Sequence, residues 1–82
     1  MAEDKNRRAI CAAVAQILHA ERAERGLTLA AVADKAGLSY QMVRFVEQQK
    51  RNPTFDTLLR ICDAMEIEFI DVLKRATKAA KK

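Results

Sequence analysis

The chain has 82 residues and a formal net charge of +4; half of its residues are apolar, 32% are charged, and only two are glycine and one is proline. A chain this short builds one hydrophobic core and no second one, and its composition is typical of a helix-rich folded domain rather than a disordered one. Its first residues are charged and no apolar stretch approaches the roughly 18 residues of a membrane span, so we expect no signal peptide, no transmembrane helix and a cytoplasmic location.

The first predicted helix covers about residues 6–25, a stretch without glycine or proline. It is rich in alanine, and apolar side chains recur in it at helical spacing: Ile10, Val14, Ile17 and Leu18. Gly26 is expected to end this helix in a left-handed conformation, with Leu27 as the apolar contact that often follows.

Two short helices are predicted next, with a sharp turn between them. Thr28 can cap the first, which ends at Gly37, and Ser39 can cap the second, which extends to about position 48. The inward-facing side chains are Leu29, Val32, Ala33 and Ala36 in the first and Val43 and Val46 in the second. A short helix pair with glycine at the turn is typical of a helix-turn-helix rather than an up-down bundle.

A fourth and a fifth helix complete the predicted fold. The polar segment 48–54 holds the only proline and is expected to be a loop, after which Thr54 can cap a helix over about residues 55–65. A last helix begins near residue 68 and fades into the lysine-rich end. The expected inward-facing residues are Leu58, Ile61, Cys62, Met65, Phe69, Val72 and Leu73. The sequence therefore predicts one compact, all-α, five-helix domain over residues 1–82, with its core in about residues 8–75 and a basic C-terminal tail in residues 74–82.

The positive charge is concentrated in that tail. Five basic residues and no acidic one follow Asp71, whereas residues 1–73 contain ten basic and eleven acidic residues and carry a net charge of −1. The tail can be a solvated helix end whose cations complement the helix dipole. A positive net charge is typical of proteins that bind nucleic acids. If this chain binds DNA, the binding must depend on a few well-placed cations rather than on a general positive field.

Nothing in the sequence predicts catalysis or a metal site. Cys11 and Cys62 lie far apart, and the single histidine, His19, does not complete a ligand set with them. We expect both cysteines to be reduced core residues and His19 to lie on a helix surface. No nucleophile and base stand at a catalytic spacing, so we expect no enzyme, no cofactor and no small-molecule ligand.

The segment GLTLAAVADKAGLSYQMVRFVEQQKRNPTFDTLLRICDAM resembles the lambda-repressor-like helix-turn-helix family, also called the Cro/repressor or XRE type. Members of this family have a Gly-Leu-Thr turn, Leu-Ala in the second helix, Gly-Leu/Val-Ser at the turn, a β-branched pair in the third helix, and then Glu and an Arg-x-Pro-Ser/Thr loop. The resemblance covers roughly residues 14–73. It implies a DNA-binding regulator whose third helix lies in the major groove of double-stranded DNA.

The resemblance also implies roles for individual residues. The residues expected to face the bases are Tyr40, Gln41, Arg44 and Phe45. The residues expected at the DNA backbone are Thr28, Ser39, Lys50, Arg51 and Asn52. Arg22 and Glu47 match the positions at which related domains pair the first helix with the third, a structural ion pair.

Three residues depart from the family pattern. Leu29 replaces a glutamine that commonly helps to hold a phosphate, so that contact falls to a backbone amide or is absent. Gln49 stands where glycine often follows the third helix, which indicates either a left-handed residue or a longer helix. Glu21 occupies a position that is usually apolar.

One such domain contacts about half of an operator, so we expect a homodimer. Leu59 and Ile70 fall off the inward-facing stripes, and with Met65 and Ile67 they could form a two-fold patch. The alternative is a monomer with scattered surface apolar residues.

The predicted function is sequence-specific transcription regulation at a palindromic operator, by a protein of the phage-repressor or restriction–modification controller type. Two alternatives remain open: a DNA-binding antitoxin that represses its own operon, and a protein-interaction module without DNA function.

Overall fold

The computed structural model describes residues 2–81; Met1 and Lys82, the outermost residues of the predicted domain and of its basic tail, lie outside them. The described part folds into five helices: α1 (Ala2–Glu24), α2 (Leu29–Ala36), α3 (Tyr40–Glu47), α4 (Phe55–Ala64) and α5 (Phe69–Ala80). The all-α, five-helix prediction is confirmed. None of these helices is long and apolar enough to cross a membrane.

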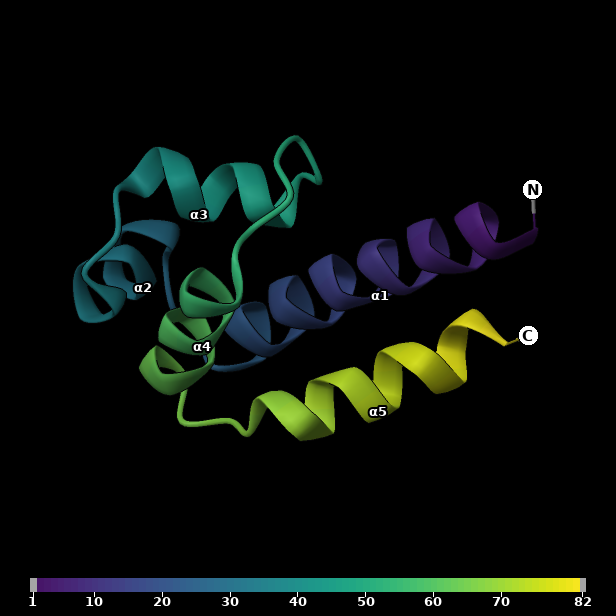
Figure 1. The fold of residues 1–82 in the computed structure, drawn as a ribbon. Helices are drawn as coiled ribbons and strands as arrows, with labels where there is room; N and C mark the ends of the chain where they lie inside the picture. Colours follow the sequence, from purple (N-terminus) through teal and green to yellow (C-terminus); the bar gives the residue numbers. More distant parts are fainter. Residues whose placement is uncertain (1, 82) are drawn as a thin grey trace.

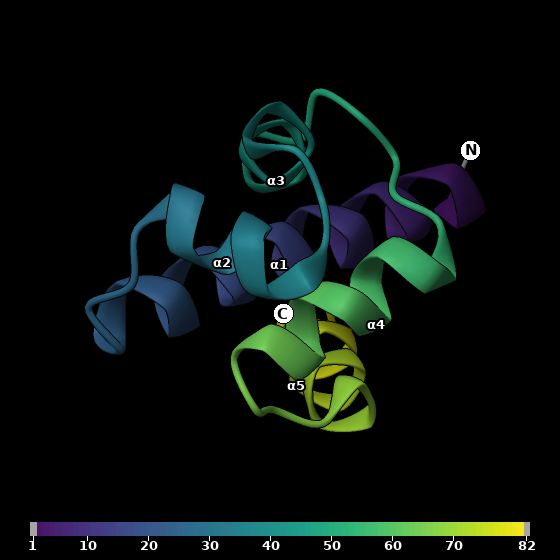
Figure 2. The ribbon, with the colours of Figure 1, turned by 90° about the vertical axis from the view of Figure 1, so that its left-hand side faces the viewer.

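Helices α1 and α5 lie side by side and antiparallel, with both chain ends at the same end of the molecule (Figure 1). Helices α2, α3 and α4 pack around the other end of this pair. In Figure 1 and in the view turned by 90° (Figure 2), α3 and α5 lie on opposite sides of the molecule. One face of α3 is thereby left away from the rest of the chain.

All five helices contribute side chains to one hydrophobic core. Its largest fully buried members are Leu18, Val32, Val43, Ile61, Cys62 and Val72. These residues come from the stripes that the helical periodicity of the sequence marks, because residues three and four apart share one helix face. The core fixes the orientation of α3 through Val43 and Val46, which are 0% and 2% exposed.

Side-chain hydroxyls begin the three middle helices. Thr28, Ser39 and Thr54 accept hydrogen bonds from the backbone N–H groups three residues later, at 3.0, 3.0 and 3.1 Å. Each cap satisfies a donor that the first turn of a helix leaves without a backbone partner. The three predicted caps therefore set where α2, α3 and α4 start.

Two features at the chain ends differ from the sequence prediction. Helix α1 begins at Ala2, four residues before the expected start. Helix α5 continues to Ala80, so the predicted basic tail is helical nearly throughout, and Ala76 within it is fully buried. Helices α1 and α5 are thus both longer than the hydrophobic periodicity predicted. Alanine favours helix even where few large apolar side chains mark a helix face.

Cys11 is exposed, and its predicted place in the core is wrong. Ala15, one turn later on α1, is buried, whereas Cys11 borders an open hollow between α1 and the loop that follows α3. Cys62 is buried as expected, and burial together with the nearby Asp63 carboxylate raises the pKa of its thiol to about 11.

Candidate nucleic-acid interface

The outer face of α3 carries the four residues that the sequence assigned to base reading. With 3.6 residues per turn, Gln41 lies almost opposite the buried pair of valines, and Arg44 and Phe45 flank it. Gln41 is exposed, Tyr40 is 50% exposed, and Arg44 and Phe45 are half-buried. Phe45 was expected to face the bases, but because its side chain is half-buried only part of the ring is available on this face.

An ion pair ties α3 to α1. Arg22 Nε and Nη2 donate to the two carboxylate oxygens of Glu47 at 2.7 and 3.0 Å, and Arg22 Nη1 donates to the carbonyl oxygen of Leu27 at 2.8 Å. The side chains of Arg22 and Glu47 are 14% and 8% exposed. Hydrogen bonding to Glu47 raises the pKa of the Arg22 guanidinium above its ordinary value. The end of α3 is thus held in a fixed position relative to α1.

His19 also contacts this pair, a role that the sequence did not indicate. Its Nδ1 lies 2.8 Å from Glu47 Oε1. His19, Arg22 and the preceding Ala15 follow one another at spacings of three and four on α1, so a single stripe of this helix faces α3. The helical spacing of His19 and Arg22 was the available signal.

The residues expected at the DNA backbone lie at the starts of α2 and α3 and in the loop after α3. Ser39 is its N-cap, Thr28 is the N-cap of the helix before it, and both are exposed. Lys50, Arg51 and Asn52 are exposed in the loop that follows. Ser39 and the three loop residues therefore stand at the two ends of α3, and Thr28 stands one helix earlier in the chain. Leu29, where the family has glutamine, packs its half-buried side chain against the core and offers no polar contact.

Gln49 adopts a left-handed conformation with φ of 60°, and α3 ends at Glu47. Of the two alternatives for this position, the left-handed residue is therefore the correct one. The backbone N–H of Lys50 donates to the carbonyl of Phe45 at 2.9 Å across this turn. The turn brings the cationic loop next to the C-terminal end of α3.

Glu21, the unexpected charge in α1, is satisfied by two arginines. Its carboxylate accepts a hydrogen bond from Arg75 Nη1 at 2.9 Å and also pairs with Arg25. The hydrogen bonds from Arg25 and Arg75 hold the pKa of Glu21 below its ordinary value. A polar link between α1 and α5 replaces the apolar packing that the family pattern implies.

The four residues assigned to a dimer patch separate into two groups. Leu59 and Ile70 are 47% and 59% exposed, and Ile67 is half-buried. Met65 is only 3% exposed, so its assignment to a surface patch is wrong; it lies one helical turn after Ile61 and points into the same core. The sequence missed Phe55, which at 73% is the most exposed large apolar residue described. Its ring meets that of Phe69 edge to face, with centroids 6.1 Å apart.

Among the side chains that the structure describes, no three histidine, cysteine, aspartate or glutamate residues come together in a way that could hold a metal ion.

The comparisons with known proteins bear directly on this geometry. The model of the helix-turn-helix family HTH_3 matches residues 18–72, which is more than half of the chain. A comparison with curated proteins finds no match. Family HTH_3 consists of DNA-binding regulators of the XRE or Cro/repressor type, not of enzymes.

Three similar solved structures are of the restriction–modification controller protein C.Esp1396I, each 23% identical to this chain. The wild-type protein aligns with a TM-score of 0.79, over 89% of this chain and 96% of that one. A tyrosine-to-alanine variant aligns with a TM-score of 0.77, over 84% and 90%. A tyrosine-to-phenylalanine variant bound to its highest-affinity operator site, OM, aligns with a TM-score of 0.80, over 90% and 97%. At this identity the structures establish the shared fold, and the family match establishes that this chain belongs to the HTH_3 helix-turn-helix family of DNA-binding regulators.

Proposed function

We propose that this protein is a sequence-specific transcriptional regulator that binds a palindromic operator with α3 in the major groove. The observation that supports this most strongly is the outer face of α3, which presents Gln41 directly away from the core between Arg44 and Phe45. Glutamine pairs with adenine, arginine with guanine, and an aromatic ring packs on the thymine methyl group. The face therefore offers three different kinds of base contact on a helix of eight residues.

The fixed position of this face supports sequence-specific contacts to DNA bases rather than non-specific binding to DNA. Two buried valines hold the middle and C-terminal half of α3 on the core, and the Arg22–Glu47 pair holds its last residue, so its polar side chains project from a fixed axis. Lys50, Arg51 and Asn52 follow in the loop, where cations and amides suit phosphate oxygens. In this arrangement the loop positions the protein on the duplex and α3 discriminates between bases.

A palindromic operator requires two copies of the chain. Leu59, Ile67 and Ile70 remain as candidates for the two-fold contact after Met65 is removed from the set. Among single-domain regulators, the restriction–modification controller type is favoured by the similarity to C.Esp1396I, one variant of which is bound to operator DNA. The phage-repressor type shares the same domain and the same mode of reading.

Selection of bound DNA from a random pool tests the proposal and yields the site. On that site, Gln41→Ala and Arg44→Ala should each weaken binding by about 1–3 kcal/mol and relax the base preference at one position. Lys50→Ala should weaken all sequences by the same factor. Titrations by fluorescence anisotropy on the selected and on random duplexes measure both effects, and equal behaviour of the two classes of variant would remove α3 as the reading element.

The salt dependence of binding separates this proposal from a protein-interaction module. Contacts to several phosphates release counterions, so the affinity must fall steeply between about 50 and 200 mM salt. An apolar protein interface lacks this dependence. A wild-type protein that selects no sequence from the pool and shows no such slope is not a DNA-reading regulator.

A further inference from the structure

The face of α1 that packs on α3 continues beyond the end of α3. Arg8, Ala12, Ala15, His19 and Arg22 lie at spacings of four, three, four and three along α1, and therefore on one stripe of the helix. The C-terminal part of this stripe is covered, because His19 and Arg22 bind Glu47 and Ala15 is 4% exposed. The N-terminal part, at Arg8, is exposed.

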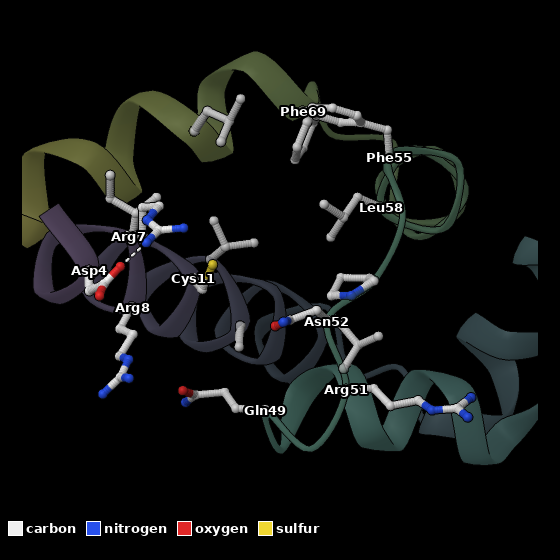
Figure 3. A pocket seen from close by; sticks show the side chains of 16 residues that line it. Asp4, Arg7, Arg8, Cys11, Gln49, Arg51, Asn52, Phe55, Leu58 and Phe69 are labelled. Atoms are coloured by element: carbon white, nitrogen blue, oxygen red, sulfur yellow. Dashed lines mark hydrogen bonds and ion pairs between the residues drawn. The ribbon is translucent and has the colours of Figure 1, made fainter.

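Arg8 borders the same hollow as the loop that follows α3. Side chains of Arg8, Gln49, Arg51 and Asn52 line it, with Phe55 and Phe69 at its far wall. In Figure 3, Arg8 and Gln49 extend to the side of α1 on which α3 lies, while Arg7 turns toward Asp4. The exposed arginine of α1 and the cationic loop thus belong to one side of the molecule.

The described acidic side chains neutralise only part of the basic charge on this side. Arg7 pairs with Asp4, but no described acidic side chain pairs with Arg8 or Arg51. The nearest carboxylate on α3, Glu47, is already engaged by Arg22. The one described carboxylate that lines the hollow, Asp4, is engaged by Arg7, so Arg8 and Arg51 remain available to an anion that lies along the loop.

We infer that Arg8 is a DNA-backbone contact that extends the interface beyond the helix-turn-helix, an inference that rests on the proposed function. Arg8 lies seven positions before Ala15, which is a rise of about 10 Å along α1. One strand of B-DNA presents a phosphate about every 3.4 Å along the duplex axis, so this span corresponds to about three phosphates. Arg8 lies outside residues 18–72, the part that matches the family model, so the family match does not itself imply this contact.

The test compares charge-removing and charge-keeping variants on the operator selected from the random pool and on random-sequence duplex DNA. Each neutralised phosphate contributes about 0.9 to the slope of log K against log salt concentration. Arg8→Gln should therefore reduce the slope by about 0.9 and weaken binding about eightfold at 0.1 M salt, equally on both DNAs. Arg8→Lys should retain most of the slope. Thermal unfolding of the variants should match the wild type, because the side chain is exposed.

Lys78→Gln is the matched control, since it removes one exposed charge from α5, on the side opposite α3. It should leave the slope unchanged. A second experiment uses a shortened version of the selected duplex that lacks the outer phosphates. Wild type and Arg8→Gln should bind this duplex with the same affinity.

Two results would overturn the inference: one contradicts only the contact at Arg8, and the other contradicts the proposed function as well. If wild type shows a base preference and a salt slope but Arg8→Gln behaves as Lys78→Gln does, only the contact at Arg8 is wrong. If wild type itself shows neither, the proposed function fails together with the contact.

Discussion

Arg22 is held by acceptors from two separate parts of the chain, the Glu47 carboxylate and the carbonyl of Leu27. Each guanidinium nitrogen therefore has a partner, in the planar two-pronged arrangement that arginine makes with a carboxylate. The pairing could be predicted from the resemblance of these two positions to the family. The contribution of Leu27 could not, because it depends on the path of the turn between α1 and α2.

Replacing Arg22 should test how much this cluster stabilises the fold. Arg22→Met leaves the Glu47 carboxylate, 8% exposed, with only His19 beside it, so we expect the free energy of unfolding to fall by about 3 kcal/mol. Urea unfolding followed by circular dichroism measures the change. The double variant Arg22→Met/Glu47→Met should recover part of the loss because no buried charge remains. A loss below about 0.5 kcal/mol would place the pair among ordinary surface ion pairs.

At the scale of the helices, α1 to α4 all end in the same backbone conformation. The sequence clearly predicted only two of these four helix ends. After α1, α2, α3 and α4 the chain passes through a left-handed residue, namely Gly26, Gly37, Gln49 and Glu66, with φ between 58° and 68°. In each, the next N–H donates to a carbonyl of the preceding helical turn. Glycine marks such an end because it lacks the Cβ that disfavours positive φ. Glutamate and glutamine have a Cβ and rarely adopt positive φ, so the sequence does not identify Glu66 as a left-handed residue at a helix end.

Helices α1 and α5 are joined by the Glu21 carboxylate, whose stabilising effect should depend on pH. Its folded-state pKa lies below the ordinary value of 4.5 because Arg25 and Arg75 bind the ionised form. The stabilisation is therefore fully present above that value and is lost as the pH falls through the folded-state pKa. Between neutral pH and about pH 3, wild type should lose roughly 0.5–1 kcal/mol more stability than Glu21→Gln, a modest amount since Arg75 is 51% exposed.

Denaturant unfolding at several pH values measures this difference. Glu24→Gln is the control, because Glu24 is exposed on the same helix and pairs with no cation among the described side chains. It should follow the wild type at every pH. Parallel curves for wild type and Glu21→Gln would show that the link between α1 and α5 contributes nothing to stability.

At the scale of the whole molecule, the fold could be predicted because each helix carries its own signals. Caps, glycines and apolar stripes fixed the number, order and approximate bounds of the helices, and the family pattern fixed which of them faces outward. The surfaces were harder, since exposure depends on where a neighbouring helix ends. Cys11 lies one turn before Ala15, outside the part of α1 that is buried, and the hollow beside it is lined by three separate stretches of the chain, within residues 4–15, 46–58 and 69–73.

The oligomeric state is the property of the whole molecule that the proposed function most requires. Leu59 and Ile70 are both large, apolar and about half exposed, on α4 and α5 respectively. Such residues have no role in the monomer's core, and burying them between two copies would be favourable by about 25 cal/mol per Å² of apolar surface. We therefore expect wild type to sediment as a dimer at micromolar concentration, with twice the 9.2 kDa mass of the chain.

Charge substitution at this face should separate the copies. Leu59→Glu/Ile70→Glu should sediment at 9.2 kDa with an unchanged circular dichroism spectrum, and its DNA affinity should fall because each half of a palindrome is then bound alone. Tyr40→Glu introduces one such charge at a similarly exposed side chain on α3 and should leave the dimer intact while weakening DNA binding. The two variants thus lose DNA affinity for different reasons, which sedimentation distinguishes. A wild-type protein that sediments as a 9.2 kDa species would remove the dimer, and with it the two-fold operator, from the proposal.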